Sequence, residues 1–410
     1  MKRTKIRFWK GCLLLTLVFT VLLVGKPSDG YAQTEPTIES QPPEYNFGEN
    51  ILFQATLHSD VPVEEVLLLV QNGPGAEVRI IPTELNQEGS IKADYSIQKN
   101  PLRAFSEVDY WFQTTLQNGE TYTSPTTSFL YSDNRFDWDM IESAPLRVHW
   151  HTGDIAFAQE ILNTAQAGVQ RAQQILPQVL VPPVVDIYVY LNGEELQETL
   201  VASNQKWIAG HADPDLSVIL VTLPPGPEQR LEMERQIPHE LMHVMMYYTD
   251  AHAYANLPVW FNEGLASLVE LYPNPDYQAL LQNAFQTNSL MPLEILCKVF
   301  PTDPHRALLA YAESASFMNF LFEKYDSAGF ERLMALYAQG QSCEQAIAAG
   351  FSATLTSLEN QWQRENFGRY SSQRAVEEML PWLVLIFFVL AGPLILMINM
   401  FRHRTAKVDL

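Results

Sequence analysis

The chain has 410 residues but only three cysteines, and just two of them, Cys297 and Cys343, lie beyond its first apolar run. It contains no Cys-x-x-Cys pair, no internal repeat and no glycine-rich phosphate loop. These absences exclude a thiolate zinc finger, a dithiol redox motif and a nucleotide-binding loop. We predict a Cys297–Cys343 disulfide in an oxidising compartment, although two cysteines alone leave free thiols as the alternative.

Basic residues are also scarce. There are 26 Lys and Arg against 47 Asp and Glu, a formal net charge of −21, and the acidic excess lies in residues 33–378. Such a surface repels phosphate backbones and anionic headgroups. The charge therefore excludes nucleic acid as a partner of this part of the chain.

Long apolar runs occur only near the two ends of the chain. Met1–Lys10 is basic, Gly11–Gly25 is apolar and uncharged, and small residues follow at Gly30 and Ala32. This order predicts a secretory signal peptide over residues 1–32, with an uncleaved anchor as the alternative.

The second run, Met379–Ile398, has no charge and is long enough to cross a bilayer. The basic residues that follow it should remain in the cytoplasm. We therefore expect a single-pass protein of the cell membrane whose main part is extracytoplasmic. The expected order is a juxtamembrane linker over 371–378, a transmembrane helix over 379–400 and a cytoplasmic tail over 401–410.

Residues 33–133 read as short strands. Runs such as Ile51–Leu57 and Val66–Val70 are separated by Gly- and Pro-containing turns. Tyr110–Pro125 looks like the last hairpin of an immunoglobulin-like or fibronectin-like domain. We expect a β-sandwich without catalytic chemistry, followed by a polar linker over 134–145.

Residues 146–370 show a mixed pattern that predicts an α+β domain. Val184–Leu191 is a nearly continuous apolar run, typical of a strand in the centre of a sheet. Ile155–Leu176 is an amphipathic helix, and Leu216–Leu223 is another strand. Apolar residues recur at helical spacing from Gln278 to Glu365. The fold class is therefore multidomain, with a β-sandwich, an α+β domain and a C-terminal transmembrane helix.

The main chemical motif is His239-Glu240-Leu241-Met242-His243. On a helix its two histidines lie one turn apart and can offer two imidazole nitrogens to one zinc ion. Glu240 would then be the general base that activates a water. Catalytic zinc usually takes three protein ligands, and Glu263 is the candidate for the third. The alternative is a pair of histidines that merely fills a helix face.

Pro238 directly precedes this motif and cannot donate a helical hydrogen bond. Either Gln229–Gln236 is a separate helix, or one helix bends before the metal site. The spacing of the ligands survives both arrangements.

The motif at 239–243, followed by Trp260-Phe-Asn-Glu-Gly-Leu-Ala, resembles the gluzincin metallopeptidases. Residues 145–367 are more specifically similar to the bacterial peptidase MA-like family, including an Ala-Gly turn before a strand and the segment AYAESASFMNFLFEKY. The resemblance implies a zinc peptidase that binds one zinc ion and acts on a peptide or protein substrate. It also implies that Leu216–Leu223 is the sheet edge to which an extended peptide adds itself.

The family supplies a Tyr or His, downstream of the third ligand, that stabilises the developing oxyanion. By this resemblance Tyr311 is the catalytic candidate, with packing as its alternative role, and His211 and His305 are weaker candidates. Zinc-binding histidines also need acceptors for their second nitrogen. Glu270 could serve as one, or could simply be solvated.

Two functions remain open from the sequence. One is a membrane-anchored, outward-facing zinc peptidase, and the other is a non-catalytic surface binding protein that kept the metal fold. Retention of Glu240 favours the enzyme, because a binding protein has no need of a general base. An ester or another amide stays possible as the substrate.

Overall fold

The computed structural model describes residues 35–200, 210–368, 379–387, 389 and 391. The predicted signal peptide (1–32), the linker over 371–378, the tail over 401–410 and part of the predicted transmembrane helix over 379–400 lie outside these residues. Among the residues described, no helix has the length and apolarity required of a membrane span.

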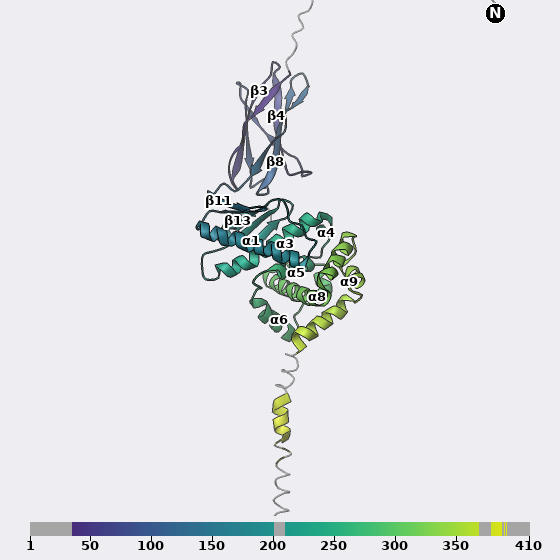
Figure 1. Cartoon of the computed structure of the whole chain (residues 1–410). Helices are drawn as coiled ribbons and strands as arrows, with labels where there is room; N and C mark the ends of the chain where they lie inside the picture. The colour runs from purple at the N-terminus through teal and green to yellow at the C-terminus, as the bar shows by residue number, and fades with distance from the viewer. Residues whose placement is uncertain (1–34, 201–209, 369–378, 388, 390, 392–410) are drawn as a thin grey trace, which may run out of the picture.

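The N-terminal part, Thr37 to Tyr131, consists of two antiparallel sheets that face each other (Figure 1). In β3 (Asn50–His58) the buried residues alternate with partly exposed ones, so that one face enters a core shared by both sheets. A multi-strand sheet domain is therefore confirmed. Its other strands are β1 (Thr37–Ser40), β2 (Glu44–Asn46), β4 (Val63–Asn72), β5 (Arg79–Pro82), β6 (Glu84–Leu85), β7 (Ser90–Ser96), β8 (Ser106–Leu116), β9 (Thr121–Thr123) and β10 (Thr127–Tyr131).

A third sheet forms the centre of the second domain, with strand order β11-β12-β13-β15-β14. β13 is the central strand, as its apolar run predicts. Val185, Ile187 and Val189 bury one face fully, whereas Asp186 and Tyr188 on the other face are partly exposed. The bounds are β11 (Asp139–Ser143), β12 (Leu146–Trp150), β13 (Val185–Tyr190), β14 (Gly210–Asp213) and β15 (Val218–Thr222).

Two expectations about this sheet need correction. The run Leu216–Leu223 is not the edge, because β15 lies between β13 and β14 and all five of its residues are buried. The edge beside the helices is β14, which is too short and too polar to be recognised by an apolar pattern. The segment 134–145, expected to be a linker, contains β11, which pairs antiparallel with β12 and extends the opposite edge.

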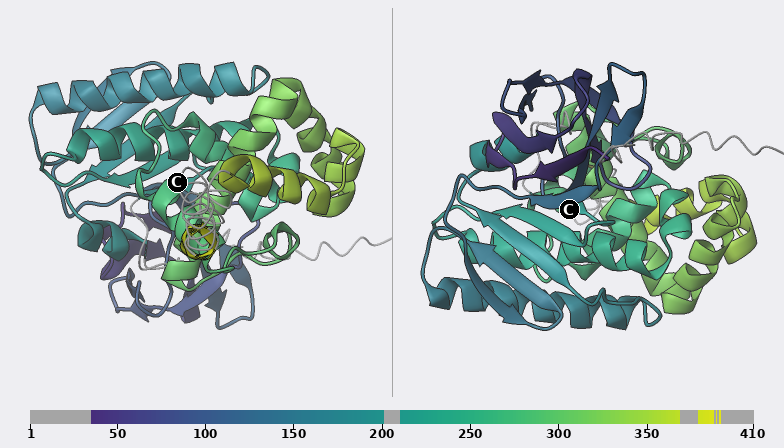
Figure 2. Two further views of the ribbon diagram at one scale, coloured as in Figure 1. Left: turned by 90° about the horizontal axis from the view of Figure 1, so that it is seen from below. Right: turned by 90° about the horizontal axis from the view of Figure 1, so that it is seen from above.

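The two faces of this sheet are covered differently. The face that includes Tyr190, Val218 and Leu220 continues into the core of the β-sandwich. The other face packs against α1 (Ile155–Ile175) and α3 (Gln229–Thr249), which lie side by side (Figure 2). The sheet therefore joins the sandwich to the helices that carry the metal motif.

Helix α3 is one helix that contains Pro238, and this settles the alternative left open by the sequence. Gly168 of α1 lies directly against the proline. A Cβ atom at Gly168 would be 3.1 Å from Pro238 Cα, closer than ordinary contacts. The glycine therefore allows α1 to approach α3 at the turn that precedes His239.

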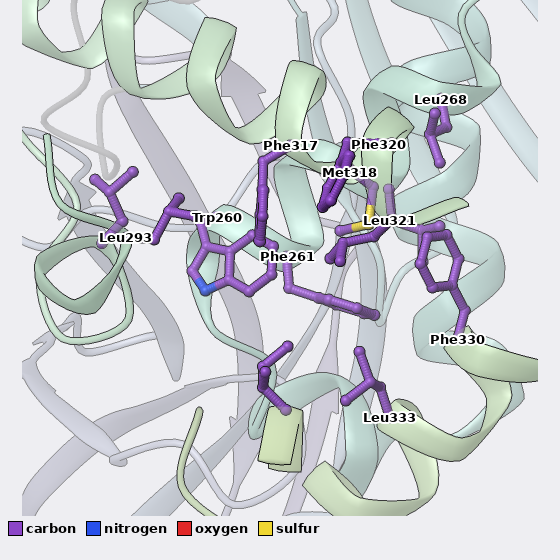
Figure 3. Close-up of a cluster of buried hydrophobic side chains, with 14 of the residues drawn as sticks. Trp260, Phe261, Leu268, Leu293, Phe317, Met318, Phe320, Leu321, Phe330 and Leu333 are labelled. Atoms are coloured by element: carbon purple, nitrogen blue, oxygen red, sulfur yellow. The ribbon is translucent and has the colours of Figure 1, made fainter. Parts of the chain in front are cut away.

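The remainder of the second domain is helical. Trp260 and Phe261 from α5 pack against Phe317 and Phe330 from α8 (Figure 3). Gly264 permits this approach, because a Cβ atom there would lie 2.6 Å from the Ser314 carbonyl oxygen. The helices are α2 (Gly193–Thr199), α4 (Ala251–Ala255), α5 (Val259–Val269), α6 (Asp276–Gln286), α7 (Leu293–Leu296), α8 (Pro304–Ala338), α9 (Cys343–Phe351) and a helical stretch over 355–368.

A disulfide closes this helical half. Cys297 follows α7 and is bonded to Cys343 at the start of α9, with their Cα atoms 5.7 Å apart. The predicted pairing is confirmed. The Trp260 indole N–H also donates to Cys343 Sγ at 3.3 Å, which connects the bridge to the helix that carries Glu263.

Glu313 on α8 gives the first prediction. It is fully buried and accepts a hydrogen bond from the Met291 backbone N–H at 2.9 Å. Burial raises the pKa of its carboxyl group from 4.5 to about 8. The folded state thus holds a proton that the unfolded state releases between these values, so stability is full below pH 4.5 and falls as the pH rises to about 8.

Glu313→Gln removes this titration. We expect chemical denaturation to show the variant more stable than the wild type at pH 8, on the order of a few kcal/mol, with a much smaller difference near pH 5. Parallel stability profiles of the two proteins across this range would contradict the assignment.

Candidate metal centre

The motif on α3 and the first turns of α5 bring three potential ligands together. One ligand atom each from His239, His243 and Glu263 lies within 4.8 Å of the other two. Glu263 Oε2 is 3.3 Å from His239 Nε2 and 3.6 Å from His243 Nε2. The three side chains thus converge on one point, as the spacing in the sequence predicts.

The second nitrogen of each histidine faces an oxygen. His239 Nδ1 lies 3.0 Å from Glu270 Oε1, and His243 Nδ1 lies 3.2 Å from Asn262 Oδ1. Because a carboxylate only accepts hydrogen bonds, Glu270 favours the tautomer of His239 with its proton on Nδ1. Its Nε2 lone pair is then directed toward Glu263. Glu270 is therefore placed as the acceptor that the sequence suggested.

Asn262 is itself held in place. Its Nδ2 donates to the Tyr254 hydroxyl oxygen at 3.2 Å, which directs its Oδ1 toward His243. Tyr254 comes from α4, immediately after the metal helix. The supporting contacts of both histidines are thus built from neighbouring helices.

The electrostatics of Glu263 match this arrangement. Burial alone would raise the pKa of its carboxyl group, but the nearby His243 and His239 outweigh burial and hold the pKa well below its usual range. The group is therefore a carboxylate at neutral pH, which is the form that binds cations.

A cleft of about 340 Å³ opens over these three residues. Glu240 lines it, and so does β14. A Cβ atom at Gly210 would lie 2.7 Å from Glu240 Oε1, so the absence of a side chain there makes room for the carboxylate. The other lining residues are His211, Ala212, Arg235, Gln236, Tyr254, Asn262, Glu270, Tyr277 and Tyr311.

Tyr311 lies in this cleft, where α8 reaches the metal centre. Burial raises the pKa of its hydroxyl, and the carboxylates of Glu263 and Glu240 raise it further. The hydroxyl group therefore stays protonated at neutral pH and can act as a hydrogen-bond donor. Its ring also packs against Phe300, with centroids 5.1 Å apart, so Tyr311 combines a packing contact with a position in the cleft.

The structure separates the two weaker histidine candidates. His211 lines the cleft from β14, whereas His305 lies at the start of α8 and is not among the lining residues. Tyr254, Asn262 and Tyr277 were not recognised from the sequence. The position of Asn262 directly before Glu263 is a sequence signal that could have identified it. The two tyrosines come from helices whose positions depend on tertiary packing.

Three solved structures that are similar to the chain resemble it only weakly. One described as a myokine structure has 13% identity and a TM-score of 0.20, and covers 25% of this chain and 99% of its own. A purple acid phosphatase from yellow lupin (Lupinus luteus) seeds has 14% identity and a TM-score of 0.20, with 50% of this chain and 39% of the phosphatase covered. A polysaccharide deacetylase from Bacillus cereus has 10% identity and a TM-score of 0.19, with 43% and 58% covered. TM-scores this low carry no argument about fold or function.

No curated protein matches the chain. The comparison with protein families is more informative, because residues 164–367 match the model of the Peptidase MA superfamily. The match begins within α1 and includes the metal motif, the helix with Glu263 and the helical half. Residues 164–367 are therefore similar to the peptidase domains of the Peptidase MA superfamily.

Proposed function

We propose that the chain is a zinc-dependent peptidase that binds one zinc ion through His239, His243 and Glu263. The observation that carries this proposal is the convergence of the three side chains in a cleft that Glu240 also lines. A non-catalytic binding protein needs no such carboxylate, so the position of Glu240 favours the enzyme.

The geometry of the three residues fits zinc. Two ligands held at about 2.0–2.1 Å by a tetrahedral zinc lie about 3.3–3.4 Å apart. The Glu263 Oε2 atom lies 3.3 and 3.6 Å from the two histidine Nε2 atoms. Two imidazoles and one carboxylate are also a donor set that catalytic zinc takes.

When bound, zinc supplies a Lewis acid that polarises the scissile carbonyl and makes a nearby water more acidic. Glu240 then accepts the proton of the attacking water and returns it to the leaving amine. The Tyr311 hydroxyl donates to the oxygen on which negative charge develops. The edge strand β14, which pairs with β15 alone among the described strands, holds the extended substrate by backbone pairing, with little demand on its sequence.

The remaining parts of the chain would place this activity outside the cell. We propose that residues 379–400 anchor the protein in the membrane and that the catalytic domain is extracytoplasmic. The β-sandwich, in an immunoglobulin-like form, would hold the peptidase domain. The basic residues after 401 and the disulfide, which is stable in oxidising compartments, support this orientation.

A mixed peptide library tests the activity. We expect the purified protein to cleave a subset of peptides, a chelator to abolish cleavage and stoichiometric zinc to restore it, because each missing ion removes one complete site. Mass spectrometry of the products identifies the cleaved bonds. Cleavage that persists after zinc has been fully removed would overturn the proposed chemistry.

A further inference from the structure

One side chain of the sandwich contacts the end of β14, the strand that lines the active-site cleft. Arg103 lies in the segment between β7 and β8, and its guanidinium contacts the last residue of β14 and a residue just after that strand in the second domain. Arg103 Nη2 is 2.6 Å from Asp213 Oδ1, and its Nη1 and Nη2 donate to the two carboxylate oxygens of Asp215 at 2.6 and 2.5 Å. The contact with Asp215 is thus bidentate, the strongest form of this ion pair.

The backbone of Arg103 is fixed within the sandwich. Asn72 Oδ1 accepts from the Arg103 N–H at 2.8 Å, and the Ser106 hydroxyl donates to the Arg103 carbonyl at 2.7 Å. Two residues further on, the ring of Phe105 stacks on Tyr188 of β13 with centroids 3.9 Å apart. The guanidinium is therefore presented from a segment that is anchored to both domains.

Asp213 connects Arg103 to a residue that lines the cleft. His211 Nε2 lies 3.4 Å from Asp213 Oδ1, the same oxygen that Arg103 contacts. The two residues are two positions apart on one strand, so their side chains leave the same face. His211 lines the cleft together with Glu240. Arg103, Asp213 and His211 therefore form a continuous series of contacts from the sandwich to the active site.

The edge strand has reason to need such support. Among the described strands, β14 pairs only with β15, and it is four residues long. Its Gly210 lies directly against Glu240, so a small shift of β14 changes the cleft on the side where the general base lies. A clamp from outside the sheet would fix both the strand and His211.

We propose that the β-sandwich completes the active site, with Arg103 as a positioning residue that acts through Asp213 to hold His211 and β14 against the bound substrate. This inference rests on the proposed peptidase function. It assigns the sandwich a part in catalysis beyond that of a spacer, through a residue that lies outside the family match at 164–367.

The chain offers a matched control for this test. Arg135 also joins the end of the sandwich to the second domain. It pairs with Asp133, two residues before it, at 2.6 Å, and donates to the Thr199 hydroxyl on α2 at 2.8 Å. Its guanidinium lies over the ring of Phe47, and the residue does not line the cleft. Arg135→Ala therefore loosens the joint between the domains without touching β14.

We expect Arg103→Ala and His211→Ala each to lower kcat/KM by about tenfold at unchanged zinc content, mostly through KM, because each removes a charge-assisted contact of Asp213. The double variant should be no worse than either single variant, since both act in one chain. Arg103→Lys should restore part of the loss, because it keeps the charge but not the bidentate fork. The proposal would be overturned if the two single losses in kcat/KM multiplied in the double variant. It would also be overturned if Arg135→Ala lowered kcat/KM as much as Arg103→Ala does.

Hydrogen–deuterium exchange provides a readout that does not depend on activity. In Arg103→Ala the amides of 210–213 should exchange faster than in the wild type, whereas Arg135→Ala should leave them unchanged. Faster exchange in a protein that cleaves no peptide would support the clamp and reject the peptidase function. Unchanged exchange over 210–213 in Arg103→Ala would reject the clamp whatever the activity.

Discussion

Glu240→Gln is expected to lower peptide turnover by about 10²-fold or more while zinc content and folding stay near those of the wild type. Glutamine keeps the size of the side chain but cannot take a proton from water. Glu240 lines the cleft and is not one of the three residues that converge as ligands, so the substitution leaves the donor set intact. The measurement is kcat on one peptide substrate, with metal content determined on the same samples.

A matched control is Glu234→Gln on the same helix. Glu234 pairs with the exposed Arg230 at 2.9 Å, a surface ion pair whose loss should matter little. Tyr311→Phe should fall between the two, with a loss mainly in kcat if its hydroxyl stabilises the oxyanion. Glu240 is not the general base if its glutamine variant retains zinc and cleaves at the wild-type rate.

Glu263→Ala is expected to have the second large effect, a sharp loss of bound zinc and with it of activity. Two histidines without the carboxylate offer two of the three ligands that a catalytic site needs. The bound metal should also stabilise the folded wild type, because unfolded chains lack the assembled site. Zinc per protein after dialysis and the rise of Tm on adding zinc should therefore both decrease in the variant.

Glu270→Gln calibrates this result. In the wild type, His239 Nδ1 lies 3.0 Å from Glu270 Oε1. The glutamine amide keeps an oxygen that can accept a hydrogen bond from His239, but it removes the negative charge. Mutation of a residue that supports a metal ligand typically costs 10–100-fold in metal affinity. Glu270→Gln should therefore bind zinc more weakly than the wild type and more tightly than Glu263→Ala. Full zinc occupancy in Glu263→Ala would remove Glu263 from the ligand set.

Features governed by local geometry were predictable from the sequence. The four-residue spacing of His239 and His243 places them on one helical face in any context, and α3 retains this face although it contains Pro238. The apolar run of β13 likewise predicted a strand in the centre of the sheet, which is where β13 lies. In both cases the information lies within one element.

Features that depend on how separate elements meet were not predictable. The edge strand β14 consists of Gly-His-Ala-Asp, which carries neither an apolar alternation nor a long run, so the stronger signal of β15 was assigned to the edge. Tyr277 of α6 lines the cleft, and the position of α6 depends on its packing against α8. Arg103 contacts Asp213 across 110 residues of sequence, and nothing local to either residue indicates the other.

Anomalous diffraction at the zinc absorption edge, from crystals of the purified wild-type protein, tests most directly whether His239, His243 and Glu263 bind one zinc ion. The expected result is a single peak in the catalytic domain, about 2.0–2.2 Å from both histidine Nε2 atoms and a Glu263 oxygen. A peak elsewhere, or crystals of zinc-saturated protein with no peak at these three residues, would contradict the assignment.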